Sequence, residues 1–420
     1  MRVYQLDLAL KAKTVSEAPR PMSAPSDKPS IAVLAFNNMS GDPEQEYFSD
    51  GISEDIITDL SKLSELHVIA RNSTFTYKGK AVDVKQIGRE LGVRYVLEGS
   101  VRKAANRVRV TSQLVDATSG AHIWADRFDR DLTDIFAVQD ELTQEIISAL
   151  KVKLTPEKRD QLARKGTIDE EAYDLFLRGR EQAWLTTKSS NVEARNLLGC
   201  AITISPGFAA AYALIAYTHA VDYANGWGEN PEVSLQTSLE IAERAVQLND
   251  EDPEALVDFA VALVFHREHD RALAEARRSI ALAPNFARGH LIVARILTFS
   301  GDAAAAINAI DACMRFDPLY RDITLHYLAE ARVSLGQFDA AVAALKRRLE
   351  RNPNAETSLA LLADCHGHLG RIAEARAAWA EVMRIAPNFS IEWQRRVLPY
   401  KNSGDFERRV EGLRKANISA

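Results

Sequence analysis

Small residues recur in the C-terminal half of this 420-residue chain with a spacing of 34 or 35 positions. Four prolines follow this spacing: Pro284, Pro318, Pro353 and Pro387. Two alanine series share it: Ala272, Ala306, Ala341 and Ala375, and Ala260, Ala294, Ala329 and Ala363. A fixed period of this length, with small residues in phase and a proline closing each unit, predicts stacked helix–turn–helix units. We therefore expect an all-α solenoid, in which each unit buries its apolar face against its neighbours.

The N-terminal half has a mixed pattern that predicts an α/β domain. Short apolar or alternating runs predict five strands, at residues 31–36, 66–70, 95–103, 107–115 and 121–128. Apolar residues every three or four positions predict helices around residues 48–63, 84–91 and 135–150. Asp83 and Gln86 form a capping-box pattern before the second helix, and Gly92 ends it. The predicted order is β-α-β-α-β-β-β-α.

These patterns divide the chain into four segments. Residues 1–29 hold a strand-like remnant and a proline-rich linker. Residues 30–154 form the α/β domain, and residues 168–390 form a solenoid of about six helix pairs. Residues 391–420 are rich in charge, so we expect a capping segment that shields the last apolar face.

The composition excludes several classes of protein. The formal net charge is −6, so there is no broad basic surface and nucleic acid is not an expected partner. No apolar run is long enough to span a bilayer, so we expect no membrane partner. Three scattered cysteines do not make a disulfide framework. A cytoplasmic location fits these features.

Catalytic motifs are absent from the sequence. There is no phosphate-binding glycine loop, nucleophile elbow or zinc-protease motif. The loop at residues 37–43 could hold a small ligand at a strand end, but its residue types also favour a plain turn. Cys365, His366 and His368 lack a standard zinc spacing, so packing is the favoured role. We expect no enzymatic activity, no cofactor and no metal.

The repeat ladders resemble tetratricopeptide repeats over residues 170–390. In that family the alanine positions let the two helices of a unit approach closely, and the proline closes the unit. The chaperone-tail clamp of some members needs lysine, asparagine and arginine, whereas the matching positions here hold Val257, Val261, Leu291 and Arg295. The resemblance therefore implies a protein-binding solenoid that does not recognise chaperone tails.

Residues 29–154 resemble the TolB-like N-terminal module of bacterial signalling proteins. The matching strings lie at residues 29–34, 38–44, 68–73, 77–79 and 91–101. In those proteins the module lies between a class III adenylate/guanylate cyclase domain and a tetratricopeptide array, or behind a winged-helix domain. Only 28 residues precede the module here, so we expect the regulatory half of such a protein without its catalytic domain.

The concave face of the solenoid is the predicted peptide-binding site. The residues in phase on the first helix of each pair are Val257, Val261, Phe265, Arg288, Leu291, Arg295, Phe299, His326, Glu330 and Asp364. They could bind an extended or helical peptide, or pack against the chain's own front domain. The leading hypothesis is a protein-interaction scaffold in bacterial signalling. The alternatives are the regulatory half of a cyclase system, with a cyclase domain as partner, and a transcription-linked sensor.

Overall fold

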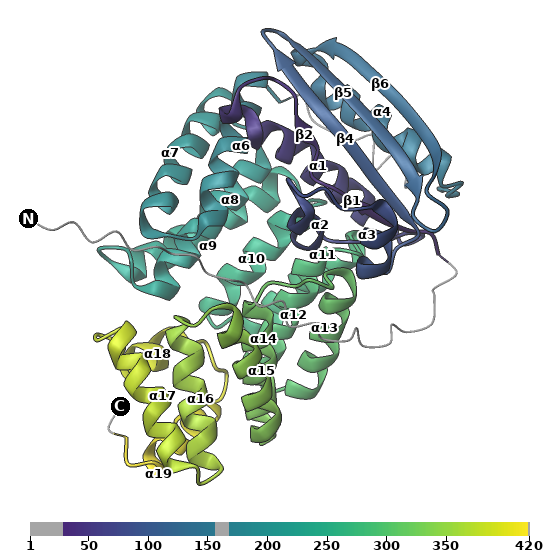
Figure 1. Ribbon diagram of the computed structural model, residues 1–420. Helices are drawn as coiled ribbons and strands as arrows, with labels where there is room; N and C mark the ends of the chain where they lie inside the picture. The colour runs from purple at the N-terminus through teal and green to yellow at the C-terminus, as the bar shows by residue number, and fades with distance from the viewer. Residues whose placement is uncertain (1–27, 156–167, 419–420) are drawn as a thin grey trace, which may run out of the picture.

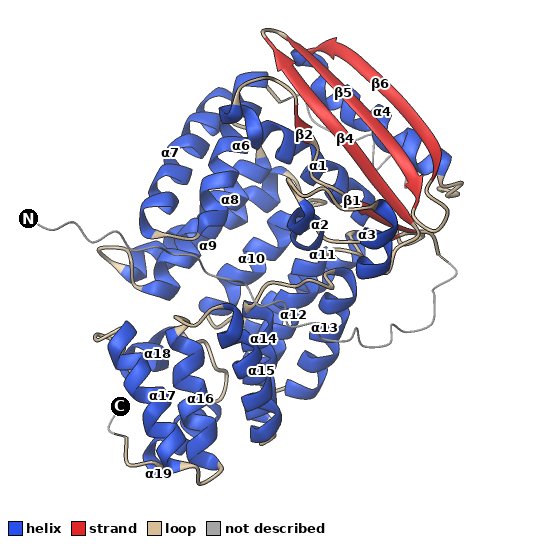
Figure 2. Ribbon diagram, in the orientation of Figure 1, coloured by secondary structure: helices blue, strands red, loops and turns tan. Residues whose placement is uncertain are grey.

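The computed structural model describes residues 28–155 and 168–418 of the chain (Figure 1). Strands are confined to one end of the molecule, and the rest of it is helical (Figure 2). The predicted fold class, an α/β domain followed by an all-α solenoid, is confirmed. The predicted strand remnant and most of the predicted linker fall in residues 1–27, outside the described residues.

The sheet of the α/β domain has the order β3-β1-β4-β5-β6, and β2 pairs with β4 beside this path. β1 is parallel to β3 and β4, whereas β4, β5 and β6 form an antiparallel meander. The strands are β1 (Ser30–Val33), β2 (Asn37–Asn38), β3 (His67–Val68), β4 (Tyr95–Ala104), β5 (Arg107–Asp116) and β6 (Ala121–Asp131).

Helices cover both faces of this sheet. Ile31 and Val33 of β1 belong to the same buried cluster as α1 (Glu46–Ser61) and α4 (Ile135–Ala149). Ala32, between them, packs with α3 (Val84–Leu91) in a separate cluster. Successive side chains of a strand point to opposite faces, so α3 lies across the sheet from α1 and α4. The remaining elements are α2 (Arg71–Thr74) and 3-10 turns at Pro43–Gln45, Phe75–Tyr77 and Leu132–Asp134.

The structure of this domain bears on two local predictions. The loop at residues 37–43 contains β2, and its polar groups bond one another: Asn38 donates to the Asp42 carbonyl and accepts from the Ser40 N–H. The turn is therefore internally satisfied. Asp83 does cap α3 by accepting from the Lys85 N–H, but the Gln86 side chain bonds Glu90, so the reciprocal half of the capping box does not form.

The described part of the solenoid contains six helix pairs. They are α6 (Glu170–Leu185) with α7 (Lys188–Ile204), α8 (Ala209–Asn225) with α9 (Pro231–Leu248), α10 (Pro253–Phe265) with α11 (His269–Leu282), α12 (Ala287–Phe299) with α13 (Ala303–Phe316), α14 (Ile323–Ser334) with α15 (Phe338–Arg351), and α16 (Glu356–His368) with α17 (Ile372–Ile385). All eight alanines of the two sequence ladders are 0% exposed, which fits helices that approach closely.

The α/β domain is docked on the solenoid through apolar and polar contacts. The core cluster of α1 and α4 continues into α6 and α8, where it includes Tyr173, Phe176 and Leu214. Further along, the loops between helix pairs meet the sheet edge. Asn285 donates to the Leu63 carbonyl at 2.8 Å, and the Ala70 N–H donates to the Phe316 carbonyl at 2.8 Å.

The C-terminal segment consists of α18 (Ile391–Val397) and α19 (Ser403–Lys415). α19 packs on α16 and α14, which are first helices of their pairs. The segment therefore covers the first helix of the last pair and continues along the inner row of helices.

Candidate interaction site on the inner face of the solenoid

The ten predicted groove residues all lie on the inner row of helices, α10, α12, α14 and α16. Their exposure differs from what an open groove requires. Seven are buried: Val257, Val261, Phe265, Phe299, His326, Glu330 and Asp364. Arg288, Leu291 and Arg295, all on α12, are half-buried. In this arrangement a partner can reach the predicted site mainly through α12.

At one end of the inner face, neighbouring helices cover the apolar residues of α10. Val257, Val261 and Phe265 belong to the main core cluster of the solenoid. The Phe265 ring meets the Tyr223 ring of α8 edge-on, with 5.5 Å between centroids. These three residues therefore pack the core, and we no longer expect them to anchor a peptide.

Arg288 is held between aromatic rings and a buried carboxylate. Its guanidinium lies 5.1 Å from the Tyr217 ring centroid and 5.8 Å from that of Trp184. It also forms an ion pair with Asp258, whose side chain is only 3% exposed. Burial raises the pKa of Asp258, and the charge of Arg288 opposes that shift. Arg288 therefore balances a buried charge and is part of the structure of the face.

Arg295 is the accessible cation of the inner face. Its guanidinium lies 5.2 Å from the ring centroids of Phe265 and Tyr327 and 5.6 Å from that of Phe299. Among the described residues no carboxylate forms an ion pair with it, and its Nε is buried without a hydrogen-bond partner. Cation–π contacts hold such a group in place without neutralising it. Its charge contributes to the lowered pKa of Glu330 and is not neutralised by a direct ion pair in the described part of the chain.

The other end of the inner face lies under the C-terminal segment. Arg409 of α19 forms an ion pair with Glu330 at 2.7 Å, and both side chains are at most 10% exposed. The Gly412 N–H donates to Asp364 Oδ1 at 2.8 Å. The Lys401 N–H donates to the carbonyl of Phe299 at 2.8 Å, and the Tyr400 ring packs against the Phe299 ring.

The titration of the covered carboxylates reflects these contacts. Burial tends to raise the pKa of Glu330, but the charges of His326 and Arg409 outweigh it and hold this pKa at about 2. Burial raises the pKa of Asp364 to about 8, against the opposing effects of the Gly412 N–H and Arg409. Asp364 Oδ2 is buried and lacks a hydrogen-bond partner in the described residues. Glu330 is thus a paired anion, whereas Asp364 favours its neutral form.

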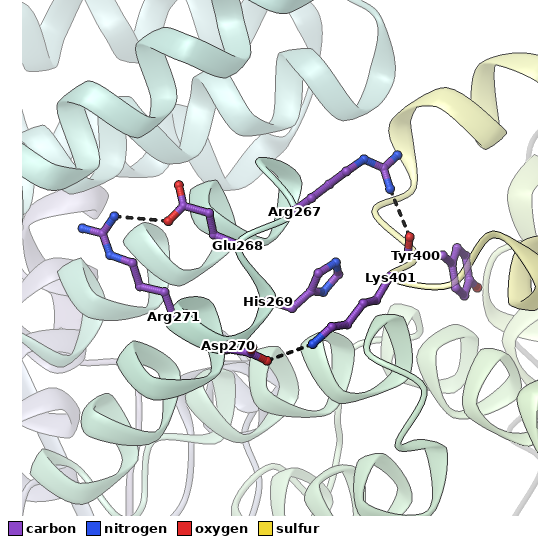
Figure 3. A pocket seen from close by; sticks show the side chains of 7 residues that line it. All are labelled: Arg267, Glu268, His269, Asp270, Arg271, Tyr400 and Lys401. Atoms are coloured by element: carbon purple, nitrogen blue, oxygen red, sulfur yellow. Dashed lines mark hydrogen bonds and ion pairs between the residues drawn. The ribbon is translucent and has the colours of Figure 1, made fainter.

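A pocket of about 300 Å³ lies where the C-terminal segment meets the turn between α10 and α11 (Figure 3). Arg267 donates to the carbonyls of Tyr400 and Arg396, and Lys401 pairs with Asp270 at 3.0 Å. His269 lies between these two links in Figure 3. Every cation here is already engaged, so the pocket is best described as the margin of an intramolecular interface.

A larger cavity, of about 960 Å³, separates the α/β domain from the start of α8 and α10. Its lining includes Asp55 and Asp59 of α1 together with Asp252, Glu254 and Asp258 of the solenoid. Burial, reinforced by the charges of Glu54 and Asp252, raises the pKa of Glu254 to about 8. Within the residues that the structure describes, no group of three or more His, Cys, Asp or Glu side chains could hold a metal ion.

Two residues of the suspected metal motif, Cys365 and His368, pack against neighbouring groups. Cys365 is 0% exposed in the core cluster, and Cys313 is also buried. His368 stacks on the Phe338 ring at 4.1 Å between centroids, and its Nε2 lies 2.9 Å from the Arg408 carbonyl. No helix in the described ranges is both long enough and apolar enough to span a bilayer.

Sequence reasoning missed the contact of the C-terminal segment with the inner face. The signal was present in part. Phe406, Arg409, Val410 and Leu413 are spaced by three, four and seven positions, which places them on one side of a helix. All four are buried in the structure. The sequence alone could not show which surface this side would cover.

Comparisons with known proteins agree with the repeat architecture. A family model for the tetratricopeptide repeat matches residues 336–395. Among solved structures, PilF of Pseudomonas aeruginosa is 16% identical, with a TM-score of 0.40, over 54% of this chain and 96% of that chain. A thermophilic TPR protein of Thermus thermophilus is 22% identical, with a TM-score of 0.35, over 43% of this chain and 92% of that chain.

The N-terminal half matches a different family from the predicted one. The model for the second domain of HilA/YgeH-like transcriptional regulators matches residues 26–171, and the TolB-like module is not confirmed. A protein of Rhizobium meliloti (strain 1021) named "Putative adenylate cyclase 3" is 51% identical over 245 residues. That match covers 58% of this chain but only 42% of the relative's length. The C-terminal half is a tetratricopeptide-like solenoid, joined to an α/β domain similar to the second domain of that regulator family.

Proposed function

We propose that this chain is a non-enzymatic interaction module that holds a protein or peptide partner on the inner face of its solenoid. One observation carries the proposal. Arg295 is a half-buried cation that lies among three aromatic rings and forms no ion pair within 4.0 Å in the described residues. An arginine on aromatic rings is a common anchor for a partner's carboxylate, because the planar guanidinium keeps its geometry.

The accessible part of the face defines the chemistry of the partner. Leu291 and Tyr327 are half-buried neighbours of Arg295 on α12 and α14. A segment that combines an acidic residue with an apolar or aromatic one would match this surface. Tetratricopeptide-like solenoids have no catalytic machinery of their own, which supports a binding role.

The test replaces the charge of Arg295 and keeps the packing of its side chain. Arg295→Met is expected to weaken the affinity for a captured partner about 10-fold or more, because one charged hot-spot contact is removed. The matched control is Arg277→Met, an exposed arginine of α11 on the outer row. Circular dichroism and melting must be unchanged in both variants. Equal capture by Arg295→Met, Arg277→Met and the natural chain would exclude this site. Arg288 is unsuitable because its loss would leave Asp258 buried and unpaired.

A second candidate function is regulation of a nucleotide cyclase in the cytoplasm. The relative named as an adenylate cyclase supports it through 51% identity, although this chain spans less than half of that protein. The chain should then change the rate of cyclic nucleotide formation by a separately supplied class III cyclase domain. An unchanged rate over a range of chain concentrations would reject this candidate and leave the interaction role intact.

A further inference from the structure

The surface under α19 has the properties of a helix-binding site. The buried side of α19 carries Phe406, Arg409, Val410 and Leu413, while Arg408 and Glu411 on the other side are exposed. This amphipathic helix lies against α14 and α16 of the inner row. An amphipathic helix in an apolar groove is a recurrent mode of peptide recognition.

Two features make this site selective, one polar and one steric. The first is Glu330, a buried carboxylate whose pairing with Arg409 at 2.7 Å compensates its charge. If α19 left, Glu330 would lose the ion pair with Arg409 and keep only His326, whose Nε2 lies 3.4 Å from its Oε1. A helix that replaced α19 would therefore bind more tightly with an arginine at the corresponding position, because it would restore this ion pair.

The second selective feature is a close helix crossing. A Cβ atom added to Gly412 would lie 1.9 Å from the carbonyl oxygen of Asp364, and one added to Gly367 would lie 1.9 Å from the carbonyl oxygen of Gly412. The backbones of α16 and α19 therefore touch, and only glycine fits at the crossing. Arg409 and Gly412 are three positions apart, on the same side of α19.

The site also has a feature of exchangeable interfaces. Much of its specificity comes from a buried ion pair and from a main-chain N–H donated to a side chain, Gly412 to Asp364. Buried ion pairs gain little net stability, because desolvation offsets the attraction. A competing helix with the same groups could therefore replace α19 at a small net change in free energy.

We propose that the inner face of α14 and α16 binds an amphipathic helix that carries an arginine and a glycine three positions apart, and that α19 occupies this site as an internal competitor. The partner of the proposed function would supply such a helix, so the inference rests on that function and deepens it. The partner would then contact both Arg295 and the surface of α14 and α16, and α19 would regulate its access to that surface.

The experiment uses the full-length chain with Gly412→Val and a fluorescent peptide with the natural sequence of residues 400–418. Valine at Gly412 clashes with α16 and releases α19 from its site. Fluorescence anisotropy should show the peptide binding the variant about 10-fold or more tightly than the natural chain, in which α19 competes for the site.

Two controls test whether the site recognises the arginine of the bound helix. A peptide with Arg409→Ala should bind the variant chain about 10-fold or more weakly, because the ion pair with Glu330 is lost. Adding Glu330→Gln to the variant chain should remove most of this difference. Equal binding of the natural and Arg409→Ala peptides, or no binding by a folded Gly412→Val chain, would overturn the proposal.

A second variant covers the case in which Gly412→Val does not fold. Leu413→Asp places a charge on the buried side of α19 without changing the crossing glycine. If both full-length variants unfold, α19 is an integral part of the core and the proposal is overturned. Arg295 is unchanged in all of these chains and the readout is binding of the α19 peptide, so their failure is distinguishable from failure of the proposed function.

Discussion

The junction between the α/β domain and the solenoid depends on Arg180 of α6. This side chain is 8% exposed and pairs with Asp55 of α1 at 2.9 Å and with Glu54 at 3.5 Å. It also donates to the Gly51 carbonyl at 3.3 Å and lies 5.2 Å from the Phe176 ring centroid. Arg180→Met would keep most of the packing and remove the charge.

The expected loss of stability depends on the hydrogen bonds and ion pairs that Asp55 and Glu54 keep. Removing one member of a buried ion pair costs about 3–5 kcal/mol. Asp55 would still accept from the Tyr173 hydroxyl and from Gln139, and Glu54 would still pair with Arg71 at 3.0 Å. We therefore expect the lower end, about 3 kcal/mol in the free energy of unfolding.

Equilibrium unfolding in urea measures this loss. Far-ultraviolet circular dichroism reports the solenoid, and Trp124 fluorescence in β6 contributes a signal from the α/β domain. Arg180→Met should separate the two transitions, with the α/β domain unfolding first. Arg178→Met, at an exposed position of the same helix, should change stability by less than about 0.5 kcal/mol. A loss below about 1 kcal/mol in the free energy of unfolding, with coincident transitions, would refute the reasoning, since removing one member of a buried ion pair should cost more.

Three further predictions concern single sites. Burial raises the pKa of Asp364 to about 8 in the folded chain. In the unfolded chain the same carboxyl loses its proton near pH 4. The folded state therefore binds more protons between these two values, and the free energy of unfolding falls as pH rises through this range. Asp364→Asn should therefore be the more stable form at pH 8 and flatten the pH profile of the melting temperature; a steeper profile would contradict this. Asn285→Ala should cost about 2 kcal/mol and speed amide exchange at Val68, whose N–H it accepts at 3.3 Å. Gly88→Ala would place a methyl group 2.5 Å from the Ala117 Cβ, so a loss of about 1–3 kcal/mol is expected in thermal melts.

The sequence was sufficient to predict the helix pairs, because their packing is local and periodic. Ala260 and Ala272 are small where two helices of one unit meet, and that requirement repeats in every unit. The predicted groove residues were assigned to the correct helices for the same reason. Their phase follows from the period of the repeat.

Accessibility could not be predicted in the same way, because it depends on partners far away in the chain. Glu330 looks like an exposed groove charge until Arg409, 79 positions later, is placed beside it. Asn285 reads as part of a repeat connection, yet it bonds the carbonyl of Ser61, 224 positions earlier. Neither pairing leaves a periodic trace in the sequence, so only the tertiary arrangement shows which polar residues are available.

The contacts of the C-terminal segment also bear on how the solenoid responds to force. In an open solenoid each repeat touches only its neighbours, so the array can extend like a spring. Here Arg396 of α18 forms an ion pair with Glu232 of α9 at 2.6 Å, and Arg267 donates to the Tyr400 carbonyl at 3.0 Å. These contacts connect the second and third helix pairs to the segment that follows the sixth. The C-terminal segment thus cross-links helix pairs that are not neighbours in the repeat array. The resistance of the solenoid to stretching should therefore depend on whether that segment is in place.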